Sequence, residues 1–575
     1  MKNLIKILII LIPLSLWRGA GGEVSAQSWQ WMHRMGGTSL VGNQSNDDMV
    51  TDMVTDENGN IYACGRLTNN ADFMGIPVPP STSPFPGYTI FLAKWDCSGN
   101  LTWLRTSHGG SDKGTKSLVY DNNGHLYLTG LCRVLLNDSI QFFDSLLTDY
   151  ANDLFIAKFD TSGTMDWVRV ASPGDSSLYG VPSGLAIDSK GYINYLFQAG
   201  LPGLLFPPNY YADTNMYYVA RFDALGNTIS MFPIARRFPS LEWGDYELDS
   251  KDNHYMITYW YDRASFLCAG QTVYHLNPDS TKAEFLVVKL DSTGAFSNAF
   301  QIADTVPGHG TGGSRLNIDA SDNIIVTGSG VNGFIIGNDT LNNPVNVNAG
   351  VNFIAKLSPS GSVQWLKQNY SQYVCANTGG IAIKPNHNIA YAGYYRTALY
   401  IANDTLPATY QDIFIAEIDS GGNWVMANRL GCTGDKAEVT CITTHGNDIY
   451  VAGDFKGQLL SPSDTLNFIG GNTDGFIAKF GTICTTGIDE LSQNQNASLL
   501  VYPNPVSNFL NISFQEIDIN RITIFNTLGQ TIFQKEISPN NQQNIQLNIF
   551  TLPPGIYIVQ AAGKNKTATA KFIKQ

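Results

Sequence analysis

Short apolar runs alternate with tight turns along most of this 575-residue chain. The stretch FLAKWDCSGNLTW at residues 91–103 returns as FIAKFDTSGTMDW at residues 155–167. Further copies of its apolar run lie near residues 218, 285, 353, 414 and 476, and their fourth positions are 61 to 68 residues apart. A second marker, Asp-x-x-Gly or a close variant before an apolar run, keeps the same spacing. Two markers with one period predict repeated β-sheet units.

Each unit is expected to be a four-stranded antiparallel sheet. Asp-x-x-Gly between apolar runs favours a hairpin turn, because glycine supplies a positive φ and aspartate bonds its own backbone. Sheets that are apolar on both faces must cover one another, which predicts an all-β fold with a seven-bladed β-propeller over residues 27–481. Large indole side chains are expected to pack between neighbouring blades, and these are Trp31, Trp103, Trp167 and Trp365.

The last unit lacks a fourth strand of its own. Its apolar run ends at Phe480 without the turn that follows the earlier copies, whereas the segment QSWQWMHRMGG at residues 27–37 has no such run before it. We therefore expect residues 27–37 to pair with residues 476–480. This pairing would close the ring and leave no unpaired sheet edge.

The N-terminus has the pattern of a secretory signal peptide. Lys2 and Lys6 precede an apolar run that is followed by small residues, which predicts a signal peptide over residues 1–26 with cleavage between Ala26 and Gln27. The apolar run is shorter than the roughly 20 residues that span a bilayer, and no later segment qualifies as a transmembrane segment.

Composition narrows the classes of partner and the role of cysteine. The net charge of −13, without clusters of Lys and Arg, argues against binding to nucleic acid. Eight cysteines are too few for a disulfide scaffold in a chain of this length. Cys64 and Cys132 occupy consecutive repeats at too large a separation, so the best local candidate for a disulfide is Cys432 with Cys441.

The C-terminal region predicts a second domain. Residues 482–498 are polar, as in a flexible linker. Residues 499–575 alternate apolar and polar positions in short runs, which predicts a small Ig-like β-sandwich.

Two family resemblances follow from these residues. The repeats over residues 27–480 resemble β-propeller repeats of secreted bacterial proteins, which implies a fold and little else. Residues 499–575 resemble the type A C-terminal sorting domain of the type IX secretion system, on the basis of Tyr502, Pro503, Asn504, Pro505, Gly529, Gly555, Tyr557 and Lys571. That resemblance implies the type IX secretion machinery as a partner, removal of the domain after export, and a protein at the outer cell surface or released into the medium.

The sequence offers no pattern for catalysis, a cofactor or a metal. It has neither a Gly-x-Ser-x-Gly elbow nor a His-Glu-x-x-His helix. The segment GGSDKGTK at residues 109–116 departs from a phosphate loop, because Thr115 stands where lysine should follow Gly114, and it predicts a turn. The aspartate-rich turns lack the ligands of a calcium loop. We therefore predict no catalytic, cofactor-binding or metal-binding residue.

Two other recurring patterns are open to structural explanations. A basic residue recurs at the fourth position of the apolar runs, as Lys94, Lys158, Arg221, Lys289, Lys356 and Lys479. Aspartates two residues further along, on the same strand face, are expected to neutralise most of them. The triplets that begin at Asp339, Asp404 and Asp464 resemble acceptors of bacterial O-glycosylation and equally fit a turn before the third strand.

Three functions remain open, and the last of them is a structural role in a surface layer. The first is a monomeric, exported, non-catalytic propeller that binds a glycan or a protein. The second is a secreted polysaccharide lyase or hydrolase whose site lies on one propeller face, built by loops at 66–88, 131–152, 199–216 and 329–351. Titratable side chains that converge on the central channel would favour the enzyme, whereas an aromatic platform without them would favour binding.

Overall fold

The computed structural model describes most of the chain beyond residue 26. The described residues are 27–38, 47–68, 70–78, 88–109, 111–134, 139–148, 151–171, 180–199, 203–206, 210–212, 216–236, 241–260, 265–274, 284–304, 312–330, 333–342, 350–371, 375–434, 436–484, 498–502, 506–515, 519–526, 530–537, 544–563 and 567–574. The predicted signal peptide lies outside them. Their regular structure is all β-strand, with no helix among them, and consequently none long and apolar enough to cross a membrane. The chain divides into two compact units, Met1–Ile483 and Cys484–Gln575.

Four antiparallel strands recur in the repeats of the first unit, as the turn spacing predicts. The apolar run that opened the sequence analysis is the third strand of each. From inner to outer strand, the sheets are β2 (Met49–Thr55), β3 (Ile61–Leu67), β6 (Thr89–Trp95) and β7 (Leu101–Thr106); β9 (Ser111–Tyr120), β10 (His125–Val134), β13 (Ala151–Asp160) and β14 (Met165–Val170); β15 (Val181–Ile187), β16 (Ile193–Ala199), β19 (Met216–Phe222) and β20 (Thr228–Arg236); β21 (Leu241–Leu248), β22 (His254–Trp260), β25 (Glu284–Leu290) and β26 (Phe296–Asp304); β27 (Gly312–Ile318), β28 (Ile324–Gly330), β31 (Val351–Leu357) and β32 (Val363–Ser371); β33 (Cys375–Ile383), β34 (Ile389–Ile401), β35 (Asp404–Ile418) and β36 (Trp424–Cys432); and β37 (Lys436–His445), β38 (Asp448–Lys456), β41 (Asp474–Gly481) and β1 (Ser28–Gly36).

Short hairpins lie between the second and third strands, and all but the one formed by residues 203–205 and 210–212 pair at the outer edge of the preceding sheet. The hairpin strands are β4 (Asp72–Phe73), β5 (Ile76–Pro77), β11 (Ser139–Phe142), β12 (Ser145–Thr148), β17 (Gly203–Leu205), β18 (Tyr210–Ala212), β23 (Ser265–Cys268), β24 (Gln271–Tyr274), β29 (Gly333–Ile336), β30 (Asp339–Asn342), β39 (Gln458–Leu460) and β40 (Thr465–Asn467). For example, β29 pairs with β26, and β39 pairs with β36, while β11 pairs with the short strand β8 (His108–Gly109) that follows β7. Asp339, Asp404 and Asp464 lie at the turns of three such hairpins.

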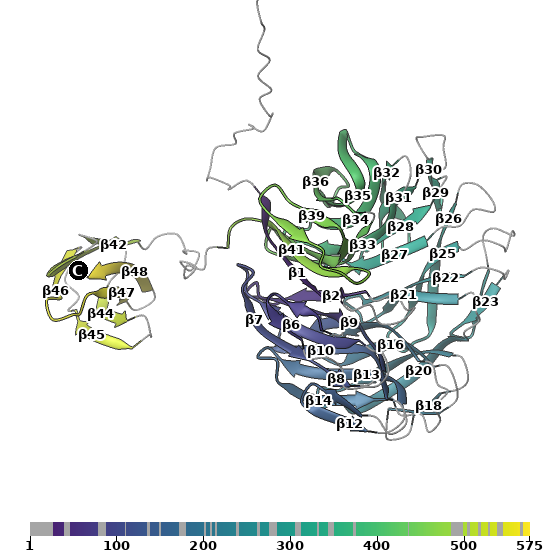
Figure 1. The fold of residues 1–575 in the computed structure, drawn as a ribbon, viewed down its shortest axis with the longest axis horizontal. Coiled ribbons are helices and arrows are strands. Elements are labelled where there is room, and N and C mark those ends of the chain that lie inside the picture. The colour runs from purple at the N-terminus through teal and green to yellow at the C-terminus, as the bar shows by residue number, and fades with distance from the viewer. Residues whose placement is uncertain are drawn as a thin grey trace, which may run out of the picture. The chain divides into compact units, whose positions relative to one another are not determined.

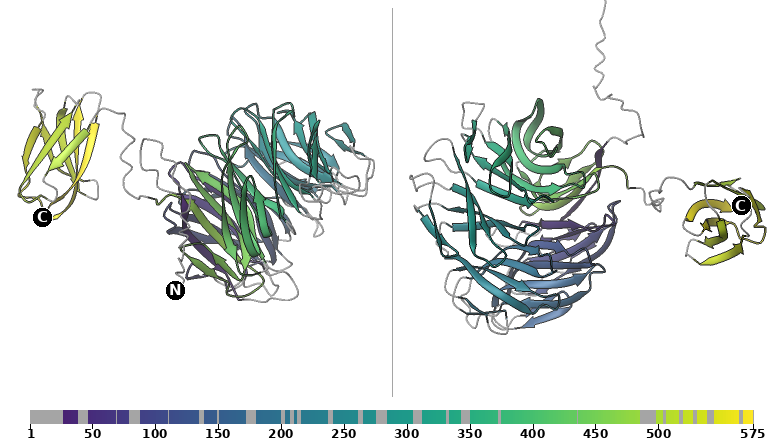
Figure 2. Two further views of the ribbon diagram at one scale, coloured as in Figure 1. Left: turned by 90° about the horizontal axis from the view of Figure 1, so that it is seen from above. Right: turned by 180° about the vertical axis from the view of Figure 1, so that it is seen from behind.

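The inner strands form a closed circle. Contacts run from β2 to β9, then to β15, β21, β27, β33 and β37, and from β37 back to β2. The sheets accordingly follow one another around a common centre in chain order, and the first strands lie beside the last (Figures 1 and 2). This arrangement of radially stacked antiparallel sheets is a β-propeller-like fold.

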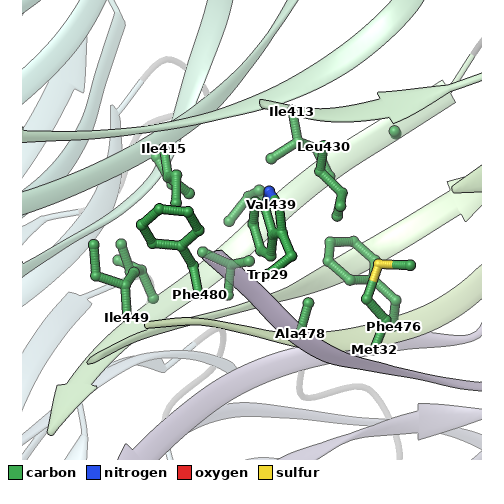
Figure 3. Packing of buried hydrophobic residues seen from close by; sticks show 14 of the residues in the cluster. Trp29, Met32, Ile413, Ile415, Leu430, Val439, Ile449, Phe476, Ala478 and Phe480 are labelled. Atoms are coloured by element: carbon green, nitrogen blue, oxygen red, sulfur yellow. The ribbon is translucent and has the colours of Figure 1, made fainter. Parts of the chain in front are cut away.

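The two ends of the first unit meet in one sheet, as predicted. Strand β1 pairs with β41 in antiparallel register, from Ser28 opposite Gly481 to Met35 opposite Gly475. Beside this pairing, Trp29 and Phe480 meet edge to face with ring centroids 5.4 Å apart. Figure 3 shows these rings packed against aliphatic side chains of the preceding sheet. Burial of this apolar surface stabilises the closure.

The second unit contains two antiparallel sheets around one apolar core. One sheet has β42 (Ser498–Tyr502), β43 (Phe509–Gln515) and β46 (Asn544–Asn548), and the other has β45 (Thr531–Glu536), β44 (Ile519–Asn526), β47 (Gly555–Gly563) and β48 (Thr567–Lys574). Leu510 and Ile512 of the first sheet share a buried cluster with Ile522 and Val559 of the second.

The predicted disulfide between Cys432 and Cys441 is wrong. Neither cysteine forms a disulfide bond, and both thiols are buried. Cys432 Sγ instead lies 3.5 Å from the carbonyl oxygen of Lys456, on β38 of the next sheet, and 3.3 Å from the N–H of Gly434. Cys64 and Cys132 are likewise not joined by a disulfide bond, in agreement with the expectation. Disulfide bonding is found at Cys97 and Cys484.

Candidate functional site

A polar cavity of about 540 Å³ lies at the centre of the ring. Residues of all the inner strands line it, from β2 through β9, β15, β21, β27 and β33 to β37. The site is therefore built by the strands that close the circle. The loops that we expected to build a binding face lie only partly within the described residues and contribute none of this lining.

Each inner strand has an irregularity at the same level. Register shifts interrupt its pairing with the second strand. The residues left out of the pairing are Thr51, Lys116, Ser183, Gly244, Asp245, Ser314, Asn377, Gly379 and Thr440. Bulges of this kind redirect side chains and are common beside functional sites. Seven of these nine residues belong to the lining of the cavity, namely Thr51, Lys116, Ser183, Gly244, Asp245, Gly379 and Thr440.

Two aspartates of the lining connect neighbouring inner strands. The carboxylate of Asp52 accepts hydrogen bonds from the N–H of Met53 and, across to β9, from the N–H of Leu118, both at 2.8 Å. The carboxylate of Asp245 accepts a hydrogen bond at 3.0 Å from the N–H of Leu316 in β27. Both carboxylates therefore accept backbone N–H groups of neighbouring inner strands and link those strands.

Arg315 on β27 contacts two other inner strands that line the cavity, β33 and β37. Its guanidinium donates to the carbonyl oxygen of Gly379 at 3.4 Å and to that of Thr440. A Cβ atom on Gly379 would lie 2.3 Å from the carbonyl oxygen of Val439, so the close approach of β33 to β37 requires glycine at this position. Arg315 thus links three inner strands through backbone carbonyls.

Two charged side chains of the cavity make no hydrogen bond to another described residue. Lys116 on β9 lines the cavity and retains accessible surface. Enclosure by protein atoms, followed by the positive charge of Arg315, lowers the pKa of Lys116. Glu247 on β21 also lines the cavity, and burial, followed by the negative charge of Asp245, raises its pKa well above the ordinary value. Burial therefore favours the protonated form of Glu247.

The cavity does not offer an activated thiol. Cys441 lines it, and burial raises the pKa of this thiol well above its usual range. Burial likewise raises the pKa of the nearby Cys64 to about 12. Since the thiolate is the reactive form, neither cysteine is a nucleophile near neutral pH. Within the described ranges, no group of three or more His, Cys, Asp or Glu side chains is arranged to hold a metal ion.

This constellation was not predicted from the sequence. We expected a turn at residues 109–116, but Ser111–Tyr120 is the inner strand β9, and Lys116 lies in its bulge. A positional signal did exist. Four residues before each inner hairpin turn the repeats place Asp52, Ser117, Gly184, Asp245, Arg315, Gly380 and Thr440. This position varies in charge and size while the turn that follows it stays nearly constant.

The four tryptophans lie on outer strands, where each meets the turn of an adjacent sheet. The indole N–H groups of Trp31, Trp103, Trp167 and Trp365 donate to the carbonyl oxygens of Cys97, Thr161, Ala224 and Ser420, at 3.3, 3.1, 3.1 and 3.0 Å. Each indole also covers the glycine of that turn, where an added Cβ would collide with the ring or lie unusually close to it. The turn glycine therefore answers two needs, a positive φ and the absence of a side chain.

Two sheets use phenylalanine where tryptophan is absent. A Cβ on Gly294 would lie 2.5 Å from the ring of Phe232, and one on Gly361 would lie 2.0 Å from the ring of Phe300. Each phenylalanine lies two residues beyond the position that tryptophan occupies in other repeats, and so on the same strand face. The same contact is thus made with a different residue from the adjacent site on the strand.

The partners predicted for the basic column are wrong, although most of the column is neutralised. Arg221, Lys289 and Lys356 form ion pairs with Asp188, Asp249 and Asp319, at 3.2, 3.7 and 2.9 Å. These aspartates open the inner hairpin turn of the same sheet, on a neighbouring strand. The aspartates two residues along the basic strand instead accept backbone N–H groups of their own turns, as Asp223 does from Leu225 and Asn227. Turn closure therefore takes these carboxylates away from the basic residues.

The remaining basic residues vary around this scheme. Lys158 pairs with Asp166 at 3.2 Å, and Lys479 pairs with Asp448 at 2.8 Å. Lys94 donates to the carbonyl oxygen of Thr161 at 3.5 Å. The column is therefore held within the sheets, and it does not form a free ring of positive charge.

Some of the predicted sorting-signal residues fall in the second unit's strands. Tyr502 ends β42 and is half exposed, and Gly555 begins β47. Tyr557 is buried, stacks on Phe572 with ring centroids 5.6 Å apart, and donates to the carbonyl oxygen of Pro553 at 2.9 Å. Lys571 is exposed on β48. Pro503, Asn504, Pro505, Gly529 and the cleavage residue Ala26 lie outside the described residues, whereas Gln27 bonds the carbonyl oxygen of Asn447.

Comparisons with known proteins bear on the two units differently. Residues 500–575 match the family described as the secretion system C-terminal sorting domain. The endo-acting ulvan lyase of Formosa agariphila is 35% identical over 83 residues, which are 14% of this chain and 16% of the lyase, so the match spans about a sixth of that relative.

Solved structures resemble the chain only loosely. The WD40 β-propeller domain of Doa1 is 11% identical, covers 80% of this chain and 98% of its own, and has a TM-score of 0.36. A mutant of Synechocystis apocarotenoid oxygenase is 11% identical, covers 75% of this chain and 95% of its own, and has a TM-score of 0.33.

The predicted sorting domain and destination are confirmed by the family match at the C-terminus. Residues 500–575 are a type IX secretion system C-terminal sorting domain, and the chain is an exported all-β protein of the cell surface or the extracellular space.

Proposed function

We propose that this chain is an exported, non-catalytic binding module whose ligand occupies the central cavity of a seven-bladed β-propeller. The propeller would comprise residues 27–481, preceded by a signal peptide at 1–26 and followed by a linker at 482–498 and an Ig-like sorting domain at 499–575. The closed series of contacts among inner strands supports the blade count. A single copy would suffice, because every inner strand lines the same cavity.

The hydrogen bonding of the charged lining carries this proposal. Asp52 and Asp245 are taken up by backbone N–H groups, and Arg315 by backbone carbonyls. Groups held in this way stabilise the wall of the cavity and are less available for proton transfer or attack. A largely pre-formed cavity in which a few polar groups are available to orient a ligand is typical of a binding site.

A second candidate is a polysaccharide-active enzyme, and one observation favours it. Three carboxylates, Asp52, Asp245 and Glu247, line one cavity with Lys116 and Arg315. Glu247 has a raised pKa, as a general acid requires. A convergence of titratable groups was the feature expected of an enzyme. Among the described residues that line the cavity, Tyr246 is the sole aromatic one, and it is buried, so these residues form no aromatic platform.

Blocking the cavity tests the proposal directly. Asn317 lines the cavity on β27, and Asn317→Trp should abolish ligand binding in a glycan array and in a protein pull-down without lowering the melting temperature. Asn298→Trp is the matched control, because Asn298 is exposed on the outer strand β26. Ligands that bind both variants equally well would contradict a site in the cavity.

The enzyme is tested with the same protein. A panel of neutral and anionic polysaccharides is incubated with the full chain, and reducing ends and unsaturated products are measured. Turnover that is lost in Glu247→Gln would establish the second candidate in place of the first. Binding without turnover supports the binding module.

A further inference from the structure

The hydrogen-bond inventory of the cavity leaves two side chains for a ligand. Asp52, Asp245 and Arg315 are engaged by backbone groups of adjacent inner strands. Among the described residues, Lys116 and Glu247 have no such partner, although both line the cavity. Lys116 is exposed and Glu247 is partly buried, so their hydrogen-bonding groups are open to water or to a ligand in the cavity.

Both of these side chains are donors. The ammonium group of Lys116 offers three N–H donors and no acceptor. Glu247 lines the cavity and has Asp245 on the same strand. Burial, followed by the negative charge of Asp245, raises the pKa of its carboxyl group, which favours the protonated form that offers an O–H. A ligand that satisfies both must present acceptor oxygens.

The charges around Lys116 select between neutral and anionic oxygens. Arg315 is a second cation at the same cavity, whereas the carboxylates of Asp52 and Asp245 already accept N–H groups that partly compensate their charge. No carboxylate among the described residues pairs directly with the Lys116 ammonium within the distance of a salt bridge. An ammonium without a carboxylate partner binds an oxyanion more strongly than a hydroxyl group.

We propose that the cavity is an oxyanion site in which Lys116 binds a carboxylate or sulfate group, while Glu247 donates to a second oxygen of the same ligand. The ligand class is a small polyhydroxylated acid, for which the hydroxyl group of Thr443 provides a further partner in the lining. The hydroxyl group of Ser117 accepts the N–H of Leu185 at 3.3 Å and can still donate to the ligand. This inference rests on the proposed function, since it names what the binding cavity accepts.

Isothermal titration of the full chain tests the inference. Sodium glucuronate and glucose are the matched probes, because they differ in the carboxylate, and sodium sulfate is the probe for an inorganic anion. Glucuronate should bind at least ten-fold more tightly than glucose. Sulfate that binds without glucuronate would identify an inorganic anion as the source of the oxyanion, and glucuronate that binds without sulfate would identify a sugar acid.

Variants assign the binding to Lys116. Lys116→Met should weaken glucuronate binding at least ten-fold, whereas Lys116→Arg should retain part of the affinity because it keeps the charge. Lys190→Met is the matched control, since Lys190 is exposed on a hairpin turn, and it should bind as the unmodified chain does. Unchanged melting temperatures would show that the loss is local.

The outcomes separate this inference from the proposed function. Equal binding of glucose and glucuronate, no binding of either anion, or full affinity in Lys116→Met would overturn the oxyanion site. If a neutral ligand from the glycan array still loses binding in Asn317→Trp, the cavity remains a binding site and only its specificity for anions is refuted. If the anions do not bind through Lys116 and no neutral ligand loses binding in Asn317→Trp, both the oxyanion site and the binding function of the cavity are refuted.

Discussion

Equivalent positions of the repeats hold similar residues at the outer turns of the ring but different residues at its central cavity. At the outer turns, Asp223 and Asp291 close their loops in the same way, and aromatic rings cover the glycines three residues further on. At the centre, equivalent positions hold Asp52, Gly184 and Arg315. Each of these contacts between neighbouring sheets requires a closed turn on one sheet and an aromatic ring from the other, so the residues that make this contact recur. Residues that face the cavity have no such common contact to make, and their diversity indicates a site.

One ion pair within a sheet shows that the repeat preserves interactions and not residue types. In the sheet of β33 to β36, Lys384 occupies the place of the turn aspartate and Glu417 the place of the basic residue, and the two pair at 2.5 Å. The adjacent sheet pairs Asp319 with Lys356 at 2.9 Å. Exchange of both charges has kept the attraction, which neither residue alone would provide.

Loss of the pairing between β1 and β41 should lower the stability of the ring more than loss of an ion pair or of a turn glycine. Deletion of residues 27–37 removes β1, the outer strand of the last sheet, together with the Trp29 contacts to Phe480 and to the carbonyl oxygen of Arg429. We expect a melting temperature lower by at least 10 °C and aggregation, because β41 becomes an exposed edge. Scanning calorimetry and light scattering measure both. A monomeric variant with unchanged melting would contradict a structural role for the closure.

The charge-exchanged pair should show the next largest effect. Both side chains are almost fully buried, so Glu417→Lys places a second ammonium beside Lys384 and should lower the free energy of unfolding by ~3–5 kcal/mol. The double variant Lys384→Asp and Glu417→Lys restores the charge order of the adjacent sheet and should recover most of this loss. Recovery is incomplete because Lys384 also donates to the carbonyl oxygen of Asn447 at 2.9 Å. Urea unfolding of both variants measures the coupling, and additive losses would contradict it.

The turn glycines allow a smaller and more selective perturbation. Gly361 has φ 88° and lies against Phe300, so Gly361→Ala adds both backbone strain and a steric clash. Gly191 has φ 78° with nothing within 4 Å of an added Cβ, so Gly191→Ala adds the strain alone. We expect a loss of about 1 kcal/mol for Gly191→Ala and of about 2–3 kcal/mol for Gly361→Ala. Equal losses in urea unfolding would show that the aromatic contact has no energetic role.

The sequence predicted features that repeat and missed features that do not. The Asp-x-x-Gly turns predicted the strand order, and the missing partner of the run that ends at Phe480 predicted the pairing of β1 with β41. The ion-pair partners were misassigned, because sequence spacing relates only residues of one strand. Lys356 on β31 instead pairs with Asp319, which lies in the turn between β27 and β28.

The cavity residues could not be predicted from periodicity alone. Lys116 was assigned to a turn because its neighbours include Gly110 and Gly114, and the strand emerges only when β10 pairs with β9. The bulge that directs Lys116 inward depends on this pairing, which is a property of the sheet and not of the local sequence.

The pKa shifts at the two regions have opposite signs, which gives a final and smallest test. Burial raises the pKa of Asp52 at the cavity to about 6, whereas hydrogen bonds from Thr293 and then Ala295 lower the pKa of Asp291 at an outer turn. A raised pKa means that the folded state binds the proton more tightly, so the Asp52 contribution to stability increases as the pH falls from about 7 to about 4. A lowered pKa means that the Asp291 contribution is present above about pH 4 and is lost as the pH falls further.

Stability should therefore be greatest in mildly acidic solution. In a plot of melting temperature against pH, substitution of Asp52 should change the decline above this maximum, and substitution of Asp291 should change the decline below it. Asp52→Asn should flatten the decline in melting temperature between pH 5 and 7, by about 2 °C. Asp291→Asn should change only the limb below pH 4. Scanning calorimetry from pH 3 to pH 8 on both variants measures the limbs separately. An Asp52→Asn curve parallel to that of the unmodified chain would mean that the cavity carboxylate titrates as an exposed one does, and the contrast between centre and outer turns would then not extend to their electrostatics.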